Sequence, residues 1–323
     1  MRIGQNPAKS VDSVAKPAKV TVAIVVYIPF LGGYYQQSLD VLKLCLESIW
    51  ENTQMPYDLM VFDNASCPEV RQYLTEAQAE GKIQFLTLSD KNIGKVGAWN
   101  FIFGAAPGEF VAYADADIYH YPGWLKPQIE ILEAFPQTGM VTGMPLLPPE
   151  QYSTATVAWA EAAPEVTLER GQYLPWEDFW RHAGSLGGSE ETARTFYNEN
   201  SSLRITAAGK QLYIGAGHFQ FVTRKTVLAQ IGRLDADRPM GQVRQFDEAI
   251  NAMGALRLCT PEWHVQHIGN TMPDAHFFSG EGPRGAVQAA EKTSGRRSFL
   301  NSRLVQKLAR WLYAKSFDIL YRN

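Results

Sequence analysis

The stretch that decides the fold is FVAYADAD, residues Phe110 to Asp117. Its first five residues are apolar and predict a buried strand, and Asp115 and Asp117 follow where that strand ends. Carboxylates one residue apart can hold a hard divalent cation and a sugar hydroxyl together. A strand with such a pair at its carboxyl end is typical of a site for a nucleotide diphosphate. Short acidic pairs are also common in loops, so the meaning of this pair depends on the elements around it.

Strand and helix patterns alternate at regular spacing before this stretch. Apolar, β-branched runs predict the strands, and apolar residues at helical spacing predict the helices between them. The predicted strands are 20–28, 59–62, 83–88 and 110–114, and the helices are 38–52, 70–79 and one that starts near Val96. This alternation predicts an α/β fold, with a mostly parallel sheet and helices on both faces.

Polar side chains follow three of these strands directly. Asp63 ends the second strand, Asn92 follows the third, and Asp115 and Asp117 follow the fourth. Ligands of such sheets bind outside the carboxyl ends of the strands. We therefore expect these side chains to face one crevice.

The second half of the chain is less regular. We expect a variable insertion with some helix over 145–202, and one strand over 212–223 that is interrupted at 215–217. The other predicted elements are strands at 140–143, 256–259 and 263–267 and helices at 224–231 and 247–253. The predicted organisation is a disordered lead-in over 1–19, one domain over 20–275 with a nucleotide-binding half (20–118) and an acceptor-binding half (119–275), and a linker with a C-terminal helix over 276–323.

That C-terminal segment carries an apolar stripe at helical spacing, formed by Leu300, Leu304, Leu308 and Leu312, with basic residues beside it. Such a stripe usually faces the core of its own domain. A basic amphipathic helix can also lie on an anionic membrane surface, and this alternative stays open for 296–323.

Composition excludes several classes of protein. The chain has 323 residues, of which 46% are hydrophobic, and a formal net charge of −3, so nothing indicates nucleic-acid binding. Its three cysteines are widely spaced, which suits a reducing cytosol better than a disulfide framework. Residues 1–19 lack the apolar centre of a signal peptide, and no apolar run is long enough for a transmembrane helix. We expect a cytoplasmic protein, with a peripheral position at the inner face of the membrane as the alternative.

Taken together, the motifs resemble those of family 2 glycosyltransferases of the GT-A fold, a Rossmann-like architecture. The order and spacing of all the matching segments carry the resemblance, since no single one is specific. Besides the opening strand they are Phe62–Ser66, Asn92–Lys95 with Asn100, Asp115–Asp117, Tyr121–Leu125, Gly215–Gly217 before Arg224, Gly232–Asp235, Asp247 and His267–Asn270. The resemblance implies transfer of a sugar from a nucleoside-diphosphate-sugar donor to a hydroxyl, with inversion.

For the nucleotide, the resemblance implies that Asp63 accepts a hydrogen bond from the ring N–H of the base. Asn92 and Gly94 form a turn that approaches the ligand, and Asp115 meets the ribose. The alternatives are ordinary turn chemistry for Asp63 and Asn92. Lys95 is expected to be a solvated surface charge rather than a phosphate ligand.

For the metal, the resemblance implies that Asp117 and a late histidine, His267, hold Mn²⁺ or Mg²⁺. Hard cations favour carboxylate and phosphate oxygens, and imidazole suits Mn²⁺ better than Mg²⁺. The alternatives are an exposed loop carboxylate and a histidine that serves only as a structural hydrogen-bonding group.

For the reaction, the resemblance implies a carboxylate that takes the proton of the acceptor. The family usually has a Glu-Asp pair here, whereas this chain has Phe246 before Asp247 and Glu248 after it. Asp247 is the preferred base, Glu248 stays open, and a plain helix N-cap is the structural alternative for Asp247. Small residues at 215–217 (Gly215, Ala216 and Gly217), followed by His218, are expected to line the donor sugar and acceptor, unless they form a β-bulge.

Three other functions are alternatives to this one. A haloacid-dehalogenase-like phosphatase also ends a strand with D-x-D, but its fold begins with that motif. A sugar nucleotidyltransferase would need a basic, glycine-rich loop after the first strand, and residues 28–35 contain no Arg or Lys. A non-enzymatic sugar-binding module would tolerate loss of the base. The sequence leaves open a UDP-, GDP- or dTDP-sugar donor and a glycan, lipid-linked or small hydroxyl acceptor, as in polysaccharide biosynthesis.

Overall fold

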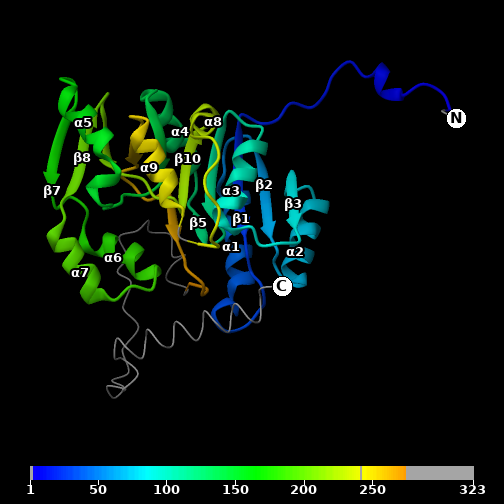
Figure 1. Ribbon diagram of the computed structural model, residues 1–323, viewed down its shortest axis with the longest axis horizontal. Coiled ribbons are helices and arrows are strands. Elements are labelled where there is room, and N and C mark those ends of the chain that lie inside the picture. Colours follow the sequence, from blue (N-terminus) through cyan, green and yellow to red (C-terminus); the bar gives the residue numbers. More distant parts are fainter. Residues whose placement is uncertain (1–2, 241, 274–323) are drawn as a thin grey trace. The chain divides into compact units, whose positions relative to one another are not determined.

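The computed structural model describes residues 3–240 and 242–273 (Figure 1). The strands are β1 (Val20–Val26), β2 (Tyr57–Asn64), β3 (Phe85–Ser89), β4 (Phe110–Asp115), β5 (Ile118–His120), β6 (Thr138–Thr142), β7 (Thr167–Gly171), β8 (Ser202–Ala207), β9 (Lys210–Ile214), β10 (Gln220–Arg224), β11 (Leu256–Cys259) and β12 (Val265–His267). The α-helices are α1 (Ser38–Asn52), α2 (Pro68–Ala79), α3 (Gly94–Ala105), α4 (Leu125–Ala134), α5 (Thr154–Ala162), α6 (Trp176–Ser185), α7 (Glu190–Glu199), α8 (Lys225–Ile231) and α9 (Arg244–Ala252). Short 3₁₀ helices are η1 (Pro7–Ser10), η2 (Gly33–Tyr35) and η3 (Glu150–Tyr152).

One large sheet organises the domain, with the strand order β3-β2-β1-β4-β10-β6-β11-β9-β8-β7. The first four strands of this order pair in parallel, as the alternating sequence pattern predicts. β10 pairs antiparallel to both β4 and β6, while β11 again pairs in parallel with β6. Only β10, β9 and β7 run opposite to the other strands, so the predicted mostly parallel sheet is confirmed.

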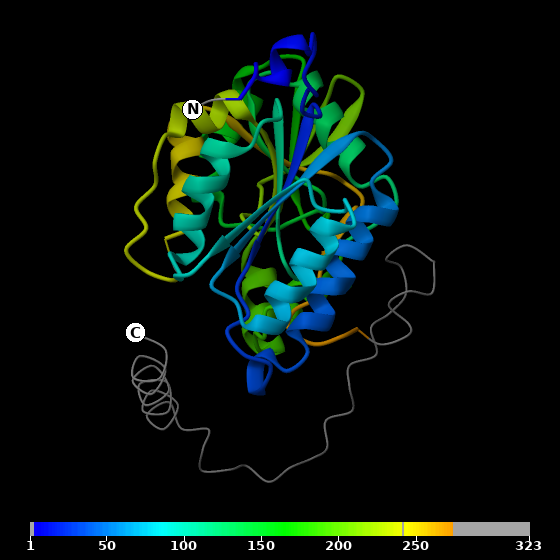
Figure 2. The same ribbon diagram turned by 90° about the vertical axis from the view of Figure 1, so that its right-hand side faces the viewer.

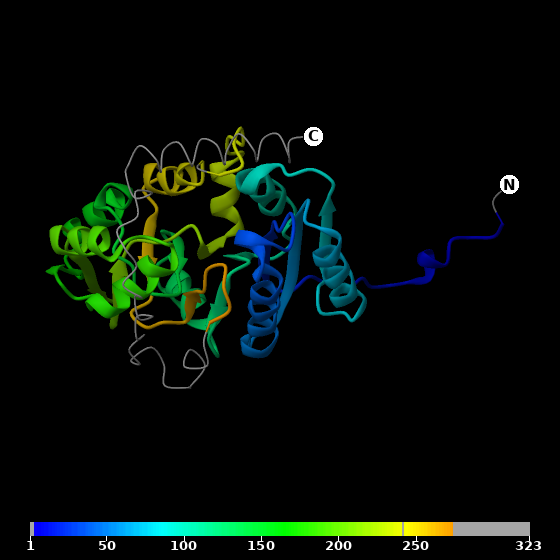
Figure 3. The same cartoon turned by 90° about the horizontal axis from the view of Figure 1, so that it is seen from below.

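Helices cover both faces of this sheet, because strand side chains alternate between the faces. Val22 and Ile24 of β1 belong to a core that includes buried side chains of α1, α2 and α4. Ala23, between them, belongs to a second core with Trp99 of α3 and Phe246 of α9. Figures 2 and 3 show α1 and α2 on one side of the sheet and α3, α8 and α9 on the other.

A second, two-stranded sheet joins distant parts of the chain. β12 pairs antiparallel with β5, and the register places His267 opposite Ile118. The backbone N–H of Ile268 also donates to the carbonyl of Asp117 at 2.8 Å. This small sheet brings the last described strand to the end of β4.

One expectation about the second half was wrong. The predicted strand over 212–223 is two separate strands, because β9 pairs with β8 and β11 whereas β10 pairs with β4 and β6. The insertion over 145–202 contains α5, α6 and α7. It also contains β7, which together with β8 extends the sheet at the end opposite β3 (Figure 1).

No helix within the described ranges is long and apolar enough to cross a membrane. The linker and C-terminal helix predicted for 276–323 lie outside the described residues. The domain boundaries stay predictions.

Candidate active site

Asp115 lies at the end of β4 and is held by two neighbours. Its carboxylate accepts a hydrogen bond from the Tyr113 hydroxyl at 2.6 Å and pairs with the Lys95 ammonium at 2.6 Å. Its backbone N–H donates to the carbonyl of Phe219 at 2.8 Å, which joins the β4 end to the segment before β10. The first carboxylate of the pair is therefore fixed in direction and already compensated in charge.

Lys95 is not the solvated surface charge that the sequence suggested. Its side chain is only 11% exposed, and the ammonium lies 5.3 Å from the centre of the Trp99 ring and 5.7 Å from that of Tyr113. A cation between aromatic faces and a carboxylate is favourably placed. The sequence around Lys95 did not indicate this partner, because Asp115 follows β4, which is separated from β3 by β2 and β1 in the sheet.

Asp117 meets His267, as the resemblance implies. The Nε2 atom of His267 lies 3.2 Å from Oδ2 of Asp117, and Nδ1 lies 2.9 Å from the hydroxyl oxygen of Ser185. The Ser185 hydroxyl donates its one proton to the His182 carbonyl, so Nδ1 of His267 donates to Ser185. In the neutral ring this leaves the lone pair on Nε2, beside Asp117.

Burial lowers the pKa of His267, but the hydrogen bond and charge of Asp117, with a further contribution from Asp115, raise it above the usual value overall. The other oxygen of Asp117, Oδ1, is buried and has no hydrogen-bond partner among the residues that the structure describes.

These features fit a divalent cation. An unsatisfied buried carboxylate oxygen and an imidazole lone pair lie side by side, and Ser185 orients the histidine from behind. Within residues 3–240 and 242–273, no group of three or more His, Cys, Asp or Glu side chains forms a metal cluster. Two protein ligands are compatible with Mg²⁺ sites that rely on substrate phosphates for the remaining oxygens.

His182 of α6 lies near His267, and the sequence analysis did not identify it as a site residue. Its ring centre is 4.7 Å from that of Phe219 and 6.2 Å from that of His267. Burial, followed by the charges of His267 and His218, lowers the pKa of His182 to about 3, so the ring is neutral at pH 7. It lies in the irregular insertion, where no periodic pattern singles it out.

Asp247 lies in the first turns of α9, but it is not the N-cap of that helix, which is Val243. Its Oδ1 accepts a hydrogen bond from Nη2 of Arg257 at 2.8 Å, and its Oδ2 lies 3.0 Å from Nδ1 of His218. Glu248 is exposed. The structure therefore brings Asp247, and not Glu248, to the segment that carries His218.

Arg257 is the buried partner that sequence reasoning missed. It lies in the middle of β11, and its guanidinium also donates to the carbonyls of Tyr152 and Ala216. Burial lowers the pKa of Arg257, and the charge of Asp247 opposes this. The signal was an arginine inside the apolar strand Leu256–Cys259, because a buried charge of that kind needs a partner.

Residues Gly215 to Gly217 form the connection between β9 and β10, not a bulge within one strand. Gly215 has φ +126°, and a Cβ there would overlap the Pro148 ring, so only glycine fits. The N–H of Gly217 donates to the Thr142 hydroxyl at 2.8 Å. This hydrogen bond holds the connection against β6, and His218 follows the connection directly.

Asp63 is more enclosed than expected. Its side chain is fully buried, accepts from the N–H of Ser66 at 3.1 Å and pairs with Arg71 at 3.0 Å. This is the turn chemistry that was the alternative for Asp63. A base N–H would reach it only if Arg71 moved, so base recognition by Asp63 stays a prediction.

Asn92 and Gly94 build the turn before α3. The Asn92 side-chain oxygen accepts from the amide of Asn64 at 2.9 Å and from the N–H of Gly94 at 2.8 Å. Gly94 has φ +73°, and a Cβ there would lie 2.7 Å from the carbonyl oxygen of Arg238. The close approach expected of this glycine is therefore to the protein's own backbone in this conformation.

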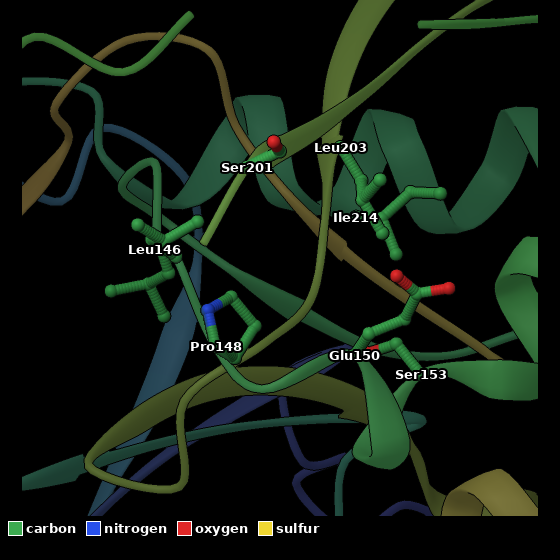
Figure 4. Close-up of a pocket in the computed structure, with 8 residues that line it drawn as sticks. Leu146, Pro148, Glu150, Ser153, Ser201, Leu203 and Ile214 are labelled. Atoms are coloured by element: carbon green, nitrogen blue, oxygen red, sulfur yellow. The ribbon is translucent and has the colours of Figure 1, made fainter. Parts of the chain in front are cut away.

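A small cavity lies beyond the β9–β10 connection (Figure 4). It is lined by Leu146, Leu147, Pro148, Glu150, Ser153, Ser201, Leu203 and Ile214, and its volume is about 10 Å³. Such a space holds at most one water molecule. The cavity is therefore too small for a sugar, and none of the predicted site residues lines it.

Comparison with known proteins links part of this chain to a family. Residues 26–165 match the model of glycosyl transferase family 2. The match covers less than half of the chain, which is similar to that family over this segment. The match includes β2, the turn before α3 and the aspartate pair at the end of β4, so the resemblance drawn from these motifs is confirmed.

Two known proteins are similar to this chain. An uncharacterized glycosyltransferase of Nostoc sp. (strain PCC 7120) is 25% identical over 135 residues, which are 40% of this chain and 42% of that protein. The crystal structure of GalNAc-T7 with UDP, GalNAc and Mn²⁺ superposes with a TM-score of 0.50 at 13% identity, covering 82% of this chain and 46% of that one. The chain thus spans less than half of either relative, and the structural likeness confirms the GT-A fold.

Proposed function

We propose that this protein transfers a sugar from a nucleoside-diphosphate-sugar donor to a hydroxyl acceptor, in a reaction that depends on Mn²⁺ or Mg²⁺. One observation carries the proposal. The aspartate pair of the family 2 segment lies together with His267 and with the Asp247–His218 pair, which come from distant parts of the chain. This gives donor-binding, metal-binding and proton-accepting groups at one end of the sheet.

The residues divide into roles on this proposal. Asp115, fixed by Tyr113 and Lys95, meets the ribose of the donor, and the Lys95 ammonium lies where it can face the diphosphate. Asp117 and His267 hold the cation. When bound, the cation would neutralise charge on the departing nucleoside diphosphate.

The remaining groups serve the sugar and the acceptor. The connection Gly215–Gly217, with Ala216, leaves room for the donor sugar because it has small side chains. Of the two candidate carboxylates, Asp247 rather than Glu248 belongs to the group that serves the acceptor, since Asp247 contacts His218. Inversion at the anomeric carbon follows from the family resemblance and is part of the proposal.

One comparison supports a nucleotide donor. GalNAc-T7, whose fold this chain shares, was crystallised with UDP and Mn²⁺, and we extend that ligand class to this chain as part of the proposal. The donor base, whether uracil, guanine or thymine, and the acceptor stay open. Nothing in the described part of the chain favours the phosphatase, the nucleotidyltransferase or the non-enzymatic module over the transferase.

Thermal unfolding of the full chain with UDP, GDP and dTDP, each with and without Mn²⁺ or Mg²⁺, tests the proposal. A ligand at 100 times its Kd adds about 2.7 kcal/mol, and each kcal/mol raises the Tm of a domain of this size by about 2–4 °C. We expect a shift of several degrees with one nucleotide, larger with metal.

Asp117→Ala should lose the metal-dependent part of the shift. Asp40→Ala is the control, because Asp40 is an exposed carboxylate on α1 that pairs with the exposed Lys43. Absence of a shift with every nucleotide would argue against a nucleotide-sugar enzyme. An undiminished metal effect in Asp117→Ala would remove the assigned metal ligand.

A further inference from the structure

Three side chains form a continuous path from the core to the surface of the site. Arg257, Asp247 and His218 have side chains that are 2%, 7% and 35% exposed. Each contacts the next, with 2.8 Å between Arg257 and Asp247 and 3.0 Å between Asp247 and His218. The most exposed group of the three is an imidazole and not a carboxylate.

Asp247 is poorly placed to take a proton from an acceptor itself. Its two oxygens are engaged on opposite sides, one by Arg257 and the other by His218. Arg257 cannot easily move aside, because it also binds the carbonyls of Tyr152 and Ala216. An acceptor hydroxyl would have to displace His218 to reach the carboxylate.

His218 has the opposite properties. An ionised carboxylate only accepts hydrogen bonds, so the proton of the contact lies on Nδ1 of His218. The neutral ring then has its lone pair on Nε2, and no residue in the described ranges bonds to that atom. The next residue, Phe219, bonds through its carbonyl to the N–H of Asp115, so the imidazole lies on the segment that touches the donor-side carboxylates.

We propose that His218 is the catalytic base of this transferase and that Asp247 is a positioning residue, a role that rests on the proposed function. The acceptor O–H proton passes to Nε2 of His218. The electron pair of the acceptor oxygen forms the new bond to the anomeric carbon, and the pair of the breaking bond leaves with the nucleoside diphosphate. Asp247 orients the ring through Nδ1 and stabilises the imidazolium, and Arg257 holds Asp247 in place.

The experiment compares His218→Ala, Asp247→Asn and the control His264→Ala in the full chain. The side chain of His264 is 20% exposed, and its ion-pair partner is Glu262, which lies outside the site. Release of nucleoside diphosphate is measured from UDP-, GDP- and dTDP-sugars, with methyl glycosides and glycerol as acceptors. Affinity for the free nucleoside diphosphate is measured in parallel, and imidazole or formate is added to each variant.

A positioned base contributes about 10²–10⁴-fold to a rate. We expect His218→Ala to lose at least about 100-fold in turnover with unchanged nucleotide affinity, and imidazole to restore part of the rate. Formate should not restore Asp247→Asn, and His264→Ala should behave as the wild type.

Two outcomes overturn the assignment and differ from a failure of the proposed function. If His218→Ala keeps turnover within about tenfold of wild type, or loses nucleotide affinity in proportion to turnover, His218 is not the base. If the wild-type protein releases no nucleoside diphosphate from any of the donors, the transferase proposal itself fails, and the role of His218 fails with it.

Discussion

Replacing Arg257 with Met removes one partner of a buried ion pair and leaves the other in place. Arg257 and Asp247 are 2% and 7% exposed, and their closest atoms are 2.8 Å apart. Methionine keeps much of the volume but none of the hydrogen bonds. Asp247 then stays buried beside His218 alone, and the carbonyls of Tyr152 and Ala216 lose their donor.

Breaking a buried pair in this way costs about 3–5 kcal/mol. By contrast, Arg170→Met removes a surface arginine that is 44% exposed and pairs with Glu150 and Glu161. Exposed pairs of this kind contribute about 0–1 kcal/mol. The two substitutions therefore differ by several kcal/mol although each removes one arginine and at least one ion pair.

Urea unfolding at pH 7, followed by tryptophan fluorescence, measures both variants together with Asp247→Asn and the double variant Asp247→Asn/Arg257→Met. The double variant should be more stable than the sum of the single effects predicts, by about 1–3 kcal/mol, because neutralising Asp247 removes the uncompensated charge. Additive single effects, or an Arg257→Met cost no larger than that of Arg170→Met, would refute this account of the buried cluster.

Three other predictions concern the turn before α3, the small sheet and the C-terminal segment. Gly94→Ala should destabilise the fold by at least about 1–2 kcal/mol because of its left-handed backbone, whereas Gly104→Ala, with open space around it, should be neutral or stabilising in the same urea assay. Burial lowers the pKa of His120 to about 3, so below about pH 6.5 the unfolded chain binds a proton that the folded chain does not. Stability should fall by up to about 1.4 kcal/mol per pH unit as the pH drops from 6 to 4, and His120→Gln should show a shallower dependence; equal slopes would contradict the assignment. If residues 296–323 bind membranes, anionic liposomes should pellet the full chain more than a chain ending at 295, and equal pelleting would remove that idea.

The local elements of the first half could be predicted from the sequence because their signals are local. α1 was predicted at Ser38–Asn52, its observed bounds, since the side chains that it buries recur at helical spacing. β4 and its aspartate pair were predicted because a continuous apolar run ends in two carboxylates. The alternation of strands and helices then implied parallel pairing, which the sheet order confirms.

The second half shows where local signals fail. The residues 212–223 have one apolar pattern, yet they form β9 and β10 in different parts of the sheet. Only the pairing partners, β8 and β11 for one and β4 and β6 for the other, separate them. Likewise, the residues next to Lys95 in the sequence are those expected around a surface lysine. Its ion-pair partner, Asp115, comes from a distant strand end and cannot be read from those neighbours.

The sequence by itself determined the α/β class, the parallel first half and the strand ends at which polar groups gather, because side-chain periodicity and turn residues act over a few positions. Only the tertiary structure decided which of these groups meet. The pairing of β5 with β12 brings His267 to Asp117, and the packing of α9 and β11 beneath the β9–β10 connection joins Arg257, Asp247 and His218. Such contacts depend on burying one shared core and satisfying its charges, and residues far apart in the chain contribute to both.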